Sequence, residues 1–366
     1  MLGGKASDKR GAPEPAMSDR FSAAQLRRFI ADAFVAVGIP PADAARIAAL
    51  MARADQSGAD GHGIFRLPQY IRRIKAGAVN VRPSMRIERE SAATALVDGD
   101  NGMGHLVMTL ATETAIAKAR SAGVAWVGAR MSNHAGPASL YASMPIEHGL
   151  IGLYMAVGNA NHLPPWGGID MLLSTNPIAI GVPAHEEQAV VLDMATTVAA
   201  YGKVKTRAQR GEMMPEGWMI DREGKPLTDP KRSDEGFLLP IGGYKGYGLA
   251  LMFGLLAGTL NGAAMGKQVI DFNADDTSVT NTGHCIVVVD PAAFGDPALF
   301  RRNVDTVVRD LRASKRLPGV ERIWLPGEQS ALKRVERGRE GVPVPAALQA
   351  TLAKLAAELG IPPLAA

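Results

Sequence analysis

The sequence has little cysteine, few aromatic residues and no concentration of charge. Cys285 is the single cysteine among 366 residues, which rules out an intrachain disulfide and any CxxC metal or redox motif, and fits a reducing, cytoplasmic setting. Aromatic residues make up 5% of the chain, and the formal charge is +4 with Lys and Arg spread along it. We therefore expect no nucleic-acid partner and only a mild preference for small anions.

The sequence also lacks a secretion signal and a clear membrane span. Residues 1–20 contain Gly, Pro and alternating charge but no apolar core, which predicts a disordered leader and leaves Met1 and Met17 as alternative starts. The long uncharged run over 246–266 carries six glycines and Asn261. We therefore expect a buried core helix there, and no membrane contact.

Hydrophobic periodicity predicts an α/β protein with a helical lobe built from both ends of the chain. Helices are expected over 22–37, 41–54 and 66–77, with amphipathic helices over 300–312 and 346–359 packing back on them. Between these ends strand and helix patterns alternate, with one helix starting at Thr197. The predicted organisation is a helical lobe over 21–95 and 305–366 and a three-layer α/β lobe over 96–304.

One segment imitates a dinucleotide-binding loop. DGDNGMGHLV follows a predicted strand and opens a helix, with glycines at 102 and 104, but Val107 stands where the third glycine belongs. The next strand ends in Arg130 rather than in an acidic residue for a ribose. We interpret this segment as a turn, so any dinucleotide is bound in a fold that is not a Rossmann fold.

Four other segments gather polar groups among glycines and prolines: DGHGIFRLPQY, SNHAGPASLY, LDMATTVAAYGKVK and GGYKGYG. Arg66 and Tyr70, one helical turn apart, suit a small carboxylic acid, and His62 precedes the same helix. His134 follows an apolar strand, and Lys245 stands among glycines at a helix start. For each residue the alternative is an ordinary structural role in the core or on the surface.

Metal ligation is a separate alternative. Asp60, His62, His134 and His148 are candidate ligands, but no HxH, HxxxH or HExxH spacing is present. No GxSxG motif and no cysteine beside a histidine supports nucleophilic catalysis. The competing hypothesis is a metal-dependent lyase or hydrolase that uses Asp60, His62 and His134.

Taken together, seven motifs in order resemble the malate/L-lactate dehydrogenase family of NAD(P)-dependent oxidoreductases. They are HGIFRLPQY, NGMGH, SNHAGPASLY, PPWGG, STNPIAIGVPA, LDMATT and GGYKGYGLAL, and the resemblance runs from about 21 to 341. It implies a non-Rossmann cofactor lobe over 96–304 with a mixed, largely antiparallel sheet, NAD or NADP as cofactor, and a homodimer.

The resemblance also implies roles for individual residues. Arg66 and Tyr70 match substrate-carboxylate residues, His134 matches the acid/base of the 2-hydroxyacid enzymes, and His62 matches the proton donor proposed in cyclic-imine reductases. Several residues, His62 among them, match cofactor contacts: His62, Ala135, Gly136, Pro137, Ala138, Leu192, Asp193, Met194 and Lys245. The segment 326–328 matches a further cofactor contact.

The sequence departs from the family pattern at two positions. Gly61 stands where many members have Ser or Thr, and Lys203 stands where the imine reductases have an aspartate. Both departures count against imine reduction. We therefore expect hydride transfer at C2 of a small 2-hydroxy or 2-oxo acid, malate-like or lactate-like, with His134 as acid/base. The substrate's side chain and the choice between NAD and NADP stay open.

Overall fold

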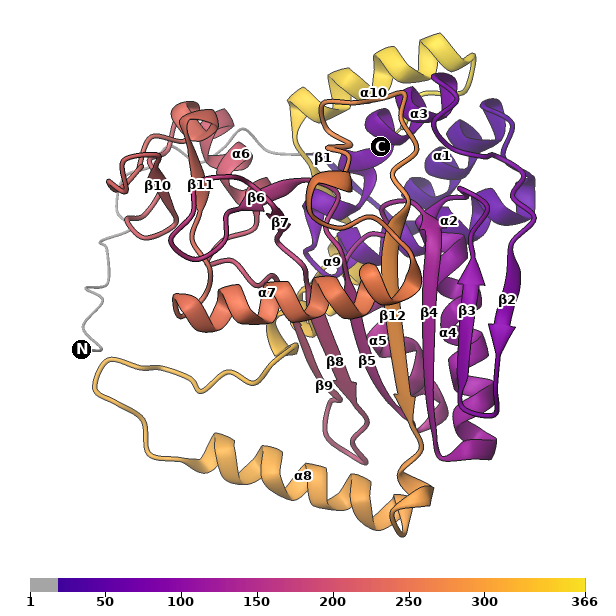
Figure 1. Ribbon diagram of the computed structural model, residues 1–366, viewed down its shortest axis with the longest axis vertical. Coiled ribbons are helices and arrows are strands. Elements are labelled where there is room, and N and C mark those ends of the chain that lie inside the picture. Colours follow the sequence, from indigo (N-terminus) through magenta and orange to yellow (C-terminus); the bar gives the residue numbers. More distant parts are fainter. Residues whose placement is uncertain (1–18, 366) are drawn as a thin grey trace.

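A mixed seven-stranded sheet organises the fold (Figure 1). The computed structural model describes residues 19–365, and in this part all neighbouring strands of the sheet run antiparallel except β3 and β4. In spatial order the strands are β2 (Arg86–Glu90), β3 (Thr94–Asp98), β4 (Val124–Ser132), β12 (Thr282–Val289), β5 (Ile151–Ala156), β8 (Ile178–Val182) and β9 (Val190–Met194). The prediction of an α/β fold with a largely antiparallel mixed sheet is confirmed.

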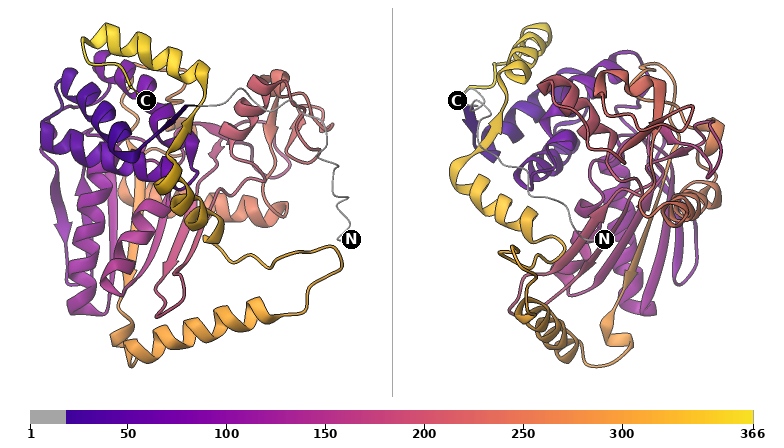
Figure 2. Two further views of the ribbon diagram at one scale, coloured as in Figure 1. Left: turned by 180° about the vertical axis from the view of Figure 1, so that it is seen from behind. Right: turned by 90° about the vertical axis from the view of Figure 1, so that its left-hand side faces the viewer.

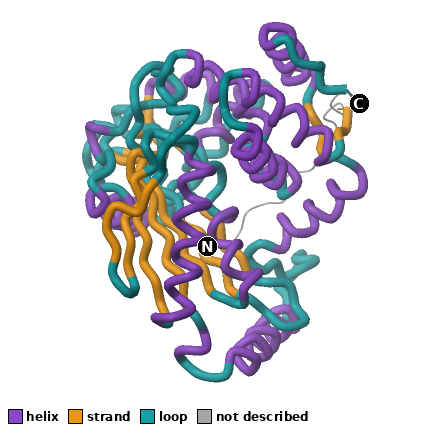
Figure 3. Tube along the Cα trace, turned by 90° about the vertical axis from the view of Figure 1, so that its right-hand side faces the viewer, coloured by secondary structure: helices purple, strands orange, loops and turns teal. Residues whose placement is uncertain are grey.

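Helices cover both faces of this sheet, because alternate strand residues point to opposite sides. Ile286 and Val288 pack with α4 (Gly104–Ala122) and α5 (Ser139–Ser143), whereas Cys285 and Met155 pack with α7 (Tyr244–Ala257). Figure 3 shows the strands with helices on either side. The three-layer arrangement expected from the alternating patterns is therefore present.

Helices from the two chain ends share one core. Its members come from α1 (Ala23–Ala36), α2 (Pro41–Gln56), α3 (Leu67–Lys75) and α10 (Ala346–Leu359). Ser22 caps α1 through a capping box with Gln25. Strand β1 (Asp19–Phe21) pairs antiparallel with β13 (Val342–Val344), which joins the ends directly. Asp19 and Arg20 thus lie in a strand rather than in the expected leader, and residues 1–18 lie outside the described residues.

A smaller unit projects beside the sheet. It contains β6 (Asn161–Leu163), β7 (Leu173–Ser174), α6 (Tyr201–Arg210), β10 (Met219–Asp221) and β11 (Gly236–Leu238). A small apolar cluster that includes Val204, Met219 and Leu238 holds α6 against the β10–β11 hairpin. Short 3₁₀ turns complete the described chain at Asp60–His62, Ile64–Arg66, Met144–His148, Pro230–Glu235, Thr259–Asn261, Gly266–Gln268 and Pro291–Ala293.

Three expectations about elements need correction. Helix α6 starts at Tyr201, not Thr197, because residues 196–198 bond to the 239–241 segment. Helix α8 (Pro297–Ala313) does not join the opening helices: Asp305 binds the backbone of the β8–β9 turn at 185–187. Strand β2 belongs to the sheet rather than to the helical core.

The long uncharged run also differs from its prediction. Helix α7 ends at Ala257, and Leu249 and Met252 are exposed on its outer side, at 40% and 51%. It is therefore a half-buried helix, not a fully buried one. No helix in residues 19–365 is long and apolar enough to cross a membrane.

Residues 314–327, here called the arm, connect α8 to α9 (Glu328–Glu340). Figure 2 shows the arm looping away from the sheet, whereas α8 lies at the end of the strands, where Asp305 contacts the β8–β9 turn. Leu317 and Trp324 of the arm are 64% and 46% exposed. The arm returns to the sheet at its end, where the amide of Val191 in β9 donates to the carbonyl of Pro326.

Candidate active site

His134 lies between two other rings. It follows β4, and its imidazole stacks on His62 at 5.4 Å between ring centroids and on Phe272 at 5.1 Å, with interplanar angles of 8° and 15°. His62 comes from the 3₁₀ turn before α3, and Phe272 comes from a loop beyond α7. Three segments far apart in the sequence therefore meet at one imidazole.

The phenol of Tyr70 lies 2.6 Å from Nδ1 of His134. The amide of Gly136 also approaches this nitrogen, at 3.3 Å, which suits the tautomer with its proton on Nε2. A phenol can donate or accept, so the Tyr70 bond is compatible with either tautomer. In both cases Tyr70 fixes the orientation of the ring and leaves Nε2 for another partner.

Arg66 is anchored on three sides. Nε donates to the carbonyl of Gly61, and Nη1 donates to Gln69 at 2.6 Å and to Asn273 at 3.1 Å. The guanidinium carbon lies 5.1 Å from the centre of the Phe272 ring, whose other neighbour is His134. No acceptor for Nη2 is present among residues 19–365, which leaves a donor for an anion.

Two acidic residues hold the turn that carries His62. Asp55 accepts from the amide of Ile64 at 2.8 Å and fills the space where a Cβ on Gly63 would lie. Burial raises the pKa of Asp55 to about 8, while the Ile64 amide opposes the change. Asp60 forms a salt bridge with Arg337 of α9, which also bonds to the Asp55 carbonyl.

The glycine at position 104 in the NGMGH segment has a structural reason. A Cβ at this position would lie 2.1 Å from the carbonyl oxygen of Asn133, so only glycine lets the start of α4 approach the His134 loop. The next residue, His105, is fully buried and meets Tyr70 edge to face at 5.9 Å. Neither ring nitrogen of His105 has a hydrogen-bond partner within the described chain.

The histidines at this site are held neutral. Burial, followed by the charge of Arg66, lowers the pKa of His62 to about 4. Burial and then the neighbouring His62 and Arg66 lower the pKa of His134 well below its usual value. At neutral pH both imidazoles are therefore free bases, which is the state needed to accept a proton.

Most of the predicted cofactor segments converge at β9. The amide of Ser139, next to the 135–138 loop, donates to Asp193 at 2.9 Å, and Val191 bonds to Pro326 beside the predicted 326–328 segment. Lys245 begins α7 as expected and is exposed, but no hydrogen bond or ion pair joins it to these segments in the described chain. The predicted contact of Lys245 with the cofactor is therefore supported only by its position at the start of α7.

The metal-site alternative does not match the geometry. Asp60 is engaged by Arg337 instead of joining His62 and His134. Residues 19–365 hold no group of three His, Cys, Asp or Glu side chains arranged for a metal ion. His148 lies elsewhere, in the turn before β5.

The sequence reasoning missed the loop over 271–274. Phe272 and Asn273 contact His134 and Arg66, and Gln69 donates to the Phe272 carbonyl at 2.7 Å. This loop has no motif and lies some 200 positions beyond α3 along the chain, as the 203-residue separation of Gln69 and Phe272 shows. Its apolar residue among acidic ones, DFNADD, is the one available signal.

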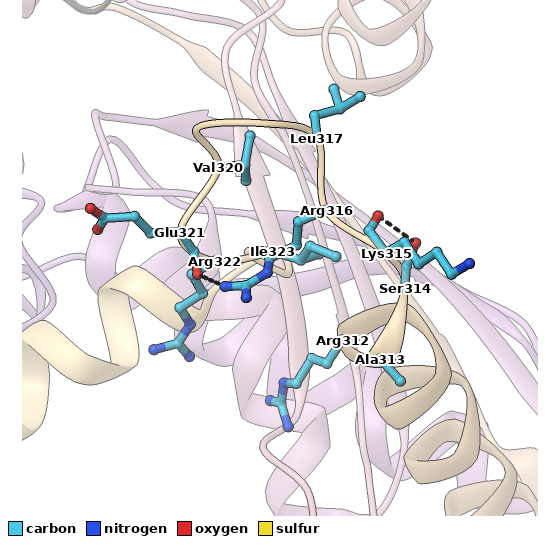
Figure 4. A pocket seen from close by; sticks show the side chains of 10 residues that line it. All are labelled: Arg312, Ala313, Ser314, Lys315, Arg316, Leu317, Val320, Glu321, Arg322 and Ile323. Carbon is cyan, nitrogen blue, oxygen red and sulfur yellow. Dashed lines mark hydrogen bonds between the residues drawn. The ribbon is translucent and has the colours of Figure 1, made fainter.

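Two hollows within residues 19–365 differ in their relation to the histidines. A cavity of about 550 Å³ lies between β6, α6 and the 271–274 loop, and Asn273 lines it. A larger hollow of about 940 Å³ is lined by residues 312–323 alone, at the end of α8 and along the arm (Figure 4). This second hollow contains none of the site residues, so we assign the candidate site to the histidines and the adjoining smaller cavity.

Comparison with known proteins identifies the family of the chain. The family model described as malate/L-lactate dehydrogenase matches residues 21–353. A malate dehydrogenase from Pyrococcus horikoshii is 36% identical over 92% of this chain and 94% of its own. A ureidoglycolate dehydrogenase (NAD(+)) from Escherichia coli O157:H7 is 33% identical over 89% of this chain and 92% of its own.

A solved structure extends the likeness to the fold. The sulfolactate dehydrogenase from Methanocaldococcus jannaschii superposes with a TM-score of 0.87 at 34% identity, over 94% of this chain and 98% of that one. The match therefore includes both the helical core and the sheet. The chain belongs to the malate/L-lactate dehydrogenase family.

Proposed function

We propose that this protein transfers a hydride between NAD or NADP and C2 of a small 2-hydroxy or 2-oxo carboxylic acid, with His134 as acid/base. The observation that supports it most is the convergence of a free guanidinium donor on Arg66 and an oriented, neutral imidazole on one loop, 271–274. Family membership and the relatives named as malate and ureidoglycolate dehydrogenases support the reaction class.

The residues fit a nicotinamide cofactor. Gly136 has a φ of +81°, and a Cβ there would lie 3.2 Å from Nε2 of His105, so this left-handed position favours glycine and lets the 135–138 loop turn closely beside α4. The amide of Ser139 ties the end of this loop to Asp193 of β9. We expect residues 135–138, 192–194 and 326–328 to hold it, with His62 beside the ring and Lys245 at a phosphate. When bound, the nicotinamide would accept the hydride that leaves C2 of a hydroxy acid, or return it to an oxo acid.

Arg66 would bind and orient the substrate carboxylate. Its Nε and Nη1 are tied to the protein, so the guanidinium plane is fixed before the substrate arrives. A charged hydrogen bond from Nη2, with a second from the Tyr70 hydroxyl, would place C2 beside His134. Orientation of this kind can supply several kcal/mol of a barrier.

His134 would carry the proton. In oxidation, Nε2 accepts the proton of the substrate hydroxyl as C2 loses its hydride, and Nδ1 then donates to the Tyr70 oxygen. In reduction the imidazolium returns the proton from Nε2 to the carbonyl oxygen while C2 gains the hydride. This cycle requires the tautomer of His134 with its proton on Nδ1, whereas the Gly136 contact suits the tautomer with its proton on Nε2. Substrate binding would therefore select the Nδ1 tautomer.

His62 is the competing acid/base. Its Nδ1 is buried with no partner in the described chain, whereas His134 has Tyr70 to orient it. Gly61 offers no hydroxyl to relay a proton to His62. We therefore assign His62 to the wall of the pocket and the proton to His134.

The test is an assay of 2-oxo acids and cyclic imines with NADH and with NADPH, followed by two variants. We expect consumption of at least one reduced cofactor with a 2-oxo acid, and a larger loss of kcat in His134→Ala than in His62→Ala, by about 100-fold. The opposite order would move the acid/base to His62. No turnover of any 2-oxo acid would refute the proposed reaction.

We also propose that the protein is a cytoplasmic homodimer. Apolar side chains stand exposed on α7 and along the arm, where Leu249, Met252, Leu317 and Trp324 meet solvent in the single chain. Exposed apolar groups of this kind mark interaction surfaces. Light scattering after gel filtration should give twice the chain mass, and Met252→Asp should lower it while Glu223→Gln, on an exposed turn, should not. A wild-type protein at the monomer mass would refute the dimer.

A further inference from the structure

Strand β4 carries a bulge near its end, just before His134. The pairing of β4 with β12 shifts register here, so that residues 130–131 of β4 oppose the single Gly283 of β12. Met131 has a φ of +47°, in the left-handed region that favours glycine. A bulge bends its strand and redirects the side chains that follow it. The direction of His134 therefore depends on how this irregular segment is held.

Side chains make hydrogen bonds to the backbone of this segment. The amide of Met131 donates to Oδ1 of Asn281 at 2.8 Å. The hydroxyl of Thr280 donates to the carbonyl of Ser132 at 3.1 Å. Asn281 and Thr280 lie directly before β12, so the chain that pairs with β4 also holds the bulge.

His284 of β12 holds the peptide group that carries His134. Its Nε2 lies 3.2 Å from the carbonyl oxygen of Asn133 and 3.1 Å from Oγ of Ser132. That carbonyl belongs to the same planar peptide group as the His134 amide, so its direction fixes the plane from which His134 extends. A Cβ on Gly104 would lie 2.1 Å from the same oxygen, so the start of α4 packs directly against it.

The partners of His284 determine where its ring proton lies. A carbonyl oxygen can only accept, so Nε2 donates to Asn133. Nδ1 then carries a lone pair, and the Tyr154 hydroxyl, 2.7 Å away, donates to it. Both rings are buried, and burial lowers the pKa of His284 to about 4 while the bond to Asn133 opposes the change. His284 is therefore a neutral donor of one fixed tautomer at neutral pH.

Asn159 connects these side chains with Phe272. Its side-chain amide donates to Oγ1 of Thr282, which lies 3.1 Å from the Thr280 hydroxyl. Its carbonyl accepts from the amide of Phe272 at 3.0 Å, and the Phe272 ring stacks on His134. The side chains around the start of β12 thus contribute to placing both the peptide of His134 and one ring against it.

We propose that His284 is a positioning residue whose Nε2–H group holds the Asn133 carbonyl and so orients the His134 ring toward the substrate. This inference rests on the proposed hydride transfer with His134 as acid/base, and it assigns His284 no contact with the substrate. Because Arg66 is the group proposed to hold the carboxylate, a misplaced His134 should lower kcat and leave KM nearly unchanged.

Two amide substitutions separate the donor from the rest of the side chain. The amide nitrogen of Gln reaches about as far as Nε2 of His, whereas that of Asn reaches only about as far as Nδ1. We expect His284→Asn to lower kcat for a 2-oxo acid at least about tenfold with KM within about twofold of wild type, and His284→Gln to lower kcat less than about threefold. A kcat in His284→Asn that is no lower than in His284→Gln, or a rise in KM larger than the fall in kcat, would overturn the proposal.

Val288→Ala is the control for a loss of stability alone. Val288 lies further along β12 and is fully buried, so the substitution leaves a cavity without touching the bonds at Asn133. It should lower the thermal midpoint and leave kcat within about twofold of wild type. A fall in kcat equal to that of His284→Asn would show that lost stability slows both variants, and would overturn the positioning role.

Nitrogen NMR of the histidine rings tests the proposal without turnover. In the wild-type protein the His284 signals, assigned by their loss in either variant, should show the neutral tautomer with its proton on Nε2. The ring signals of His134 should shift in His284→Asn and stay near their wild-type positions in His284→Gln. A proton on Nδ1 of His284, or His134 signals alike in all three proteins, would overturn the proposal. A wild-type protein that turns over no 2-oxo acid would instead refute the proposed reaction, and these signals would then decide the positioning role on their own.

Discussion

Gly61 and Gly63 lie on either side of His62, yet they face different surroundings. A Cβ on Gly63 would lie 1.9 Å from Oδ1 of the buried Asp55, whereas a Cβ on Gly61 would meet nothing within 4 Å. Asp55 cannot move away without losing its bond to the Ile64 amide. The two glycines therefore form a matched pair for testing how the His62 turn is held.

Gly63→Ala should lower the free energy of unfolding by about 1–3 kcal/mol, because the added methyl group overpacks a site closed by a buried carboxyl. Urea denaturation measures the change, and kcat should fall with it as His62 shifts. Gly61→Ala should leave the free energy of unfolding within about 0.5 kcal/mol of wild type and should leave kcat unchanged. Equal effects of the two substitutions would contradict the close contact with Asp55.

Arg66→Ala should raise KM and lower kcat together, since both binding and orientation of the carboxylate are lost. We expect kcat/KM to fall by about 100-fold, or roughly 2.7 kcal/mol at 1.36 kcal/mol per tenfold change. Arg72→Ala is the control, because Arg72 lies on α3, which begins directly after Arg66, and pairs with Asp276 at the surface. Unchanged steady-state constants in Arg66→Ala would remove Arg66 from the site.

At the residue scale, the sequence predicted the groups that gather in short motifs and missed those that reach the site from a distance. His62, Arg66 and Tyr70 fall within nine positions, and their spacing alone suggested a common pocket. Phe272 and Asn273 contact the same groups from a loop without regular structure. No local pattern encodes such a contact, because it depends on where the chain returns after α7.

At the element scale, α9 is tied to the turn that carries His62. Arg337, buried at 7% exposure, bonds to the Asp55 carbonyl and to both oxygens of Asp60. A helix from the C-terminal part of the chain thus holds a turn from the N-terminal part. This contact links the helical core to the candidate active site.

Arg337→Ala should destabilise the protein by about 1–3 kcal/mol, because a buried carbonyl and a carboxylate lose their donor. It should also lower kcat, since the His62 turn loses an anchor. Chemical denaturation and steady-state kinetics measure the two effects. Arg339→Ala, two positions on and exposed, should change neither, and an equal effect at both arginines would show that the anchor has no special role.

The sequence predicted the bounds of an element well where local residues determine where that element begins. Ser22 and Pro41 mark the starts of α1 and α2 within one residue, since caps and prolines act locally. Helix α8 was expected on the opening helices from its amphipathic face alone. Its position instead follows from Asp305 binding the β8–β9 turn, a partner that periodicity does not identify.

At the scale of the whole molecule, the fold encloses several neutral histidines. His105 and His284 are fully buried, and burial lowers their pKa to about 3 and about 4. His62 and His162 also have their pKa lowered to about 4. Between pH 6.5 and about 4 the unfolded chain binds protons at these residues that the folded chain does not, so stability falls as the pH is lowered.

At pH 5 the loss should be about 2 kcal/mol for each of the two fully buried histidines. Asp55 acts in the opposite direction, because its raised pKa of about 8 adds roughly 2.7 kcal/mol of stability between pH 7 and pH 5. The histidines are more numerous than this one carboxyl, so their combined loss of stability exceeds its gain. The free energy of unfolding in urea should therefore be lower at pH 5 than at pH 7.

A substitution at one histidine checks the cause of this pH dependence. His105→Gln should make the decline in stability between pH 7 and pH 5 shallower, because it removes one group that protonates only on unfolding. His148→Gln, at an exposed position, should leave the slope unchanged. A stability that rises towards pH 5 in the wild type would contradict the enclosed neutral state.

The stack of His62, His134 and Phe272 has a consequence for how protons move. With an aromatic ring against each flat side, the central imidazole can exchange hydrogen only through its rim. One edge of that rim is occupied by Tyr70. In the proposed reaction the other edge, at Nε2, faces the bound acid, so that acid would be the sole route for a proton between this base and the solvent.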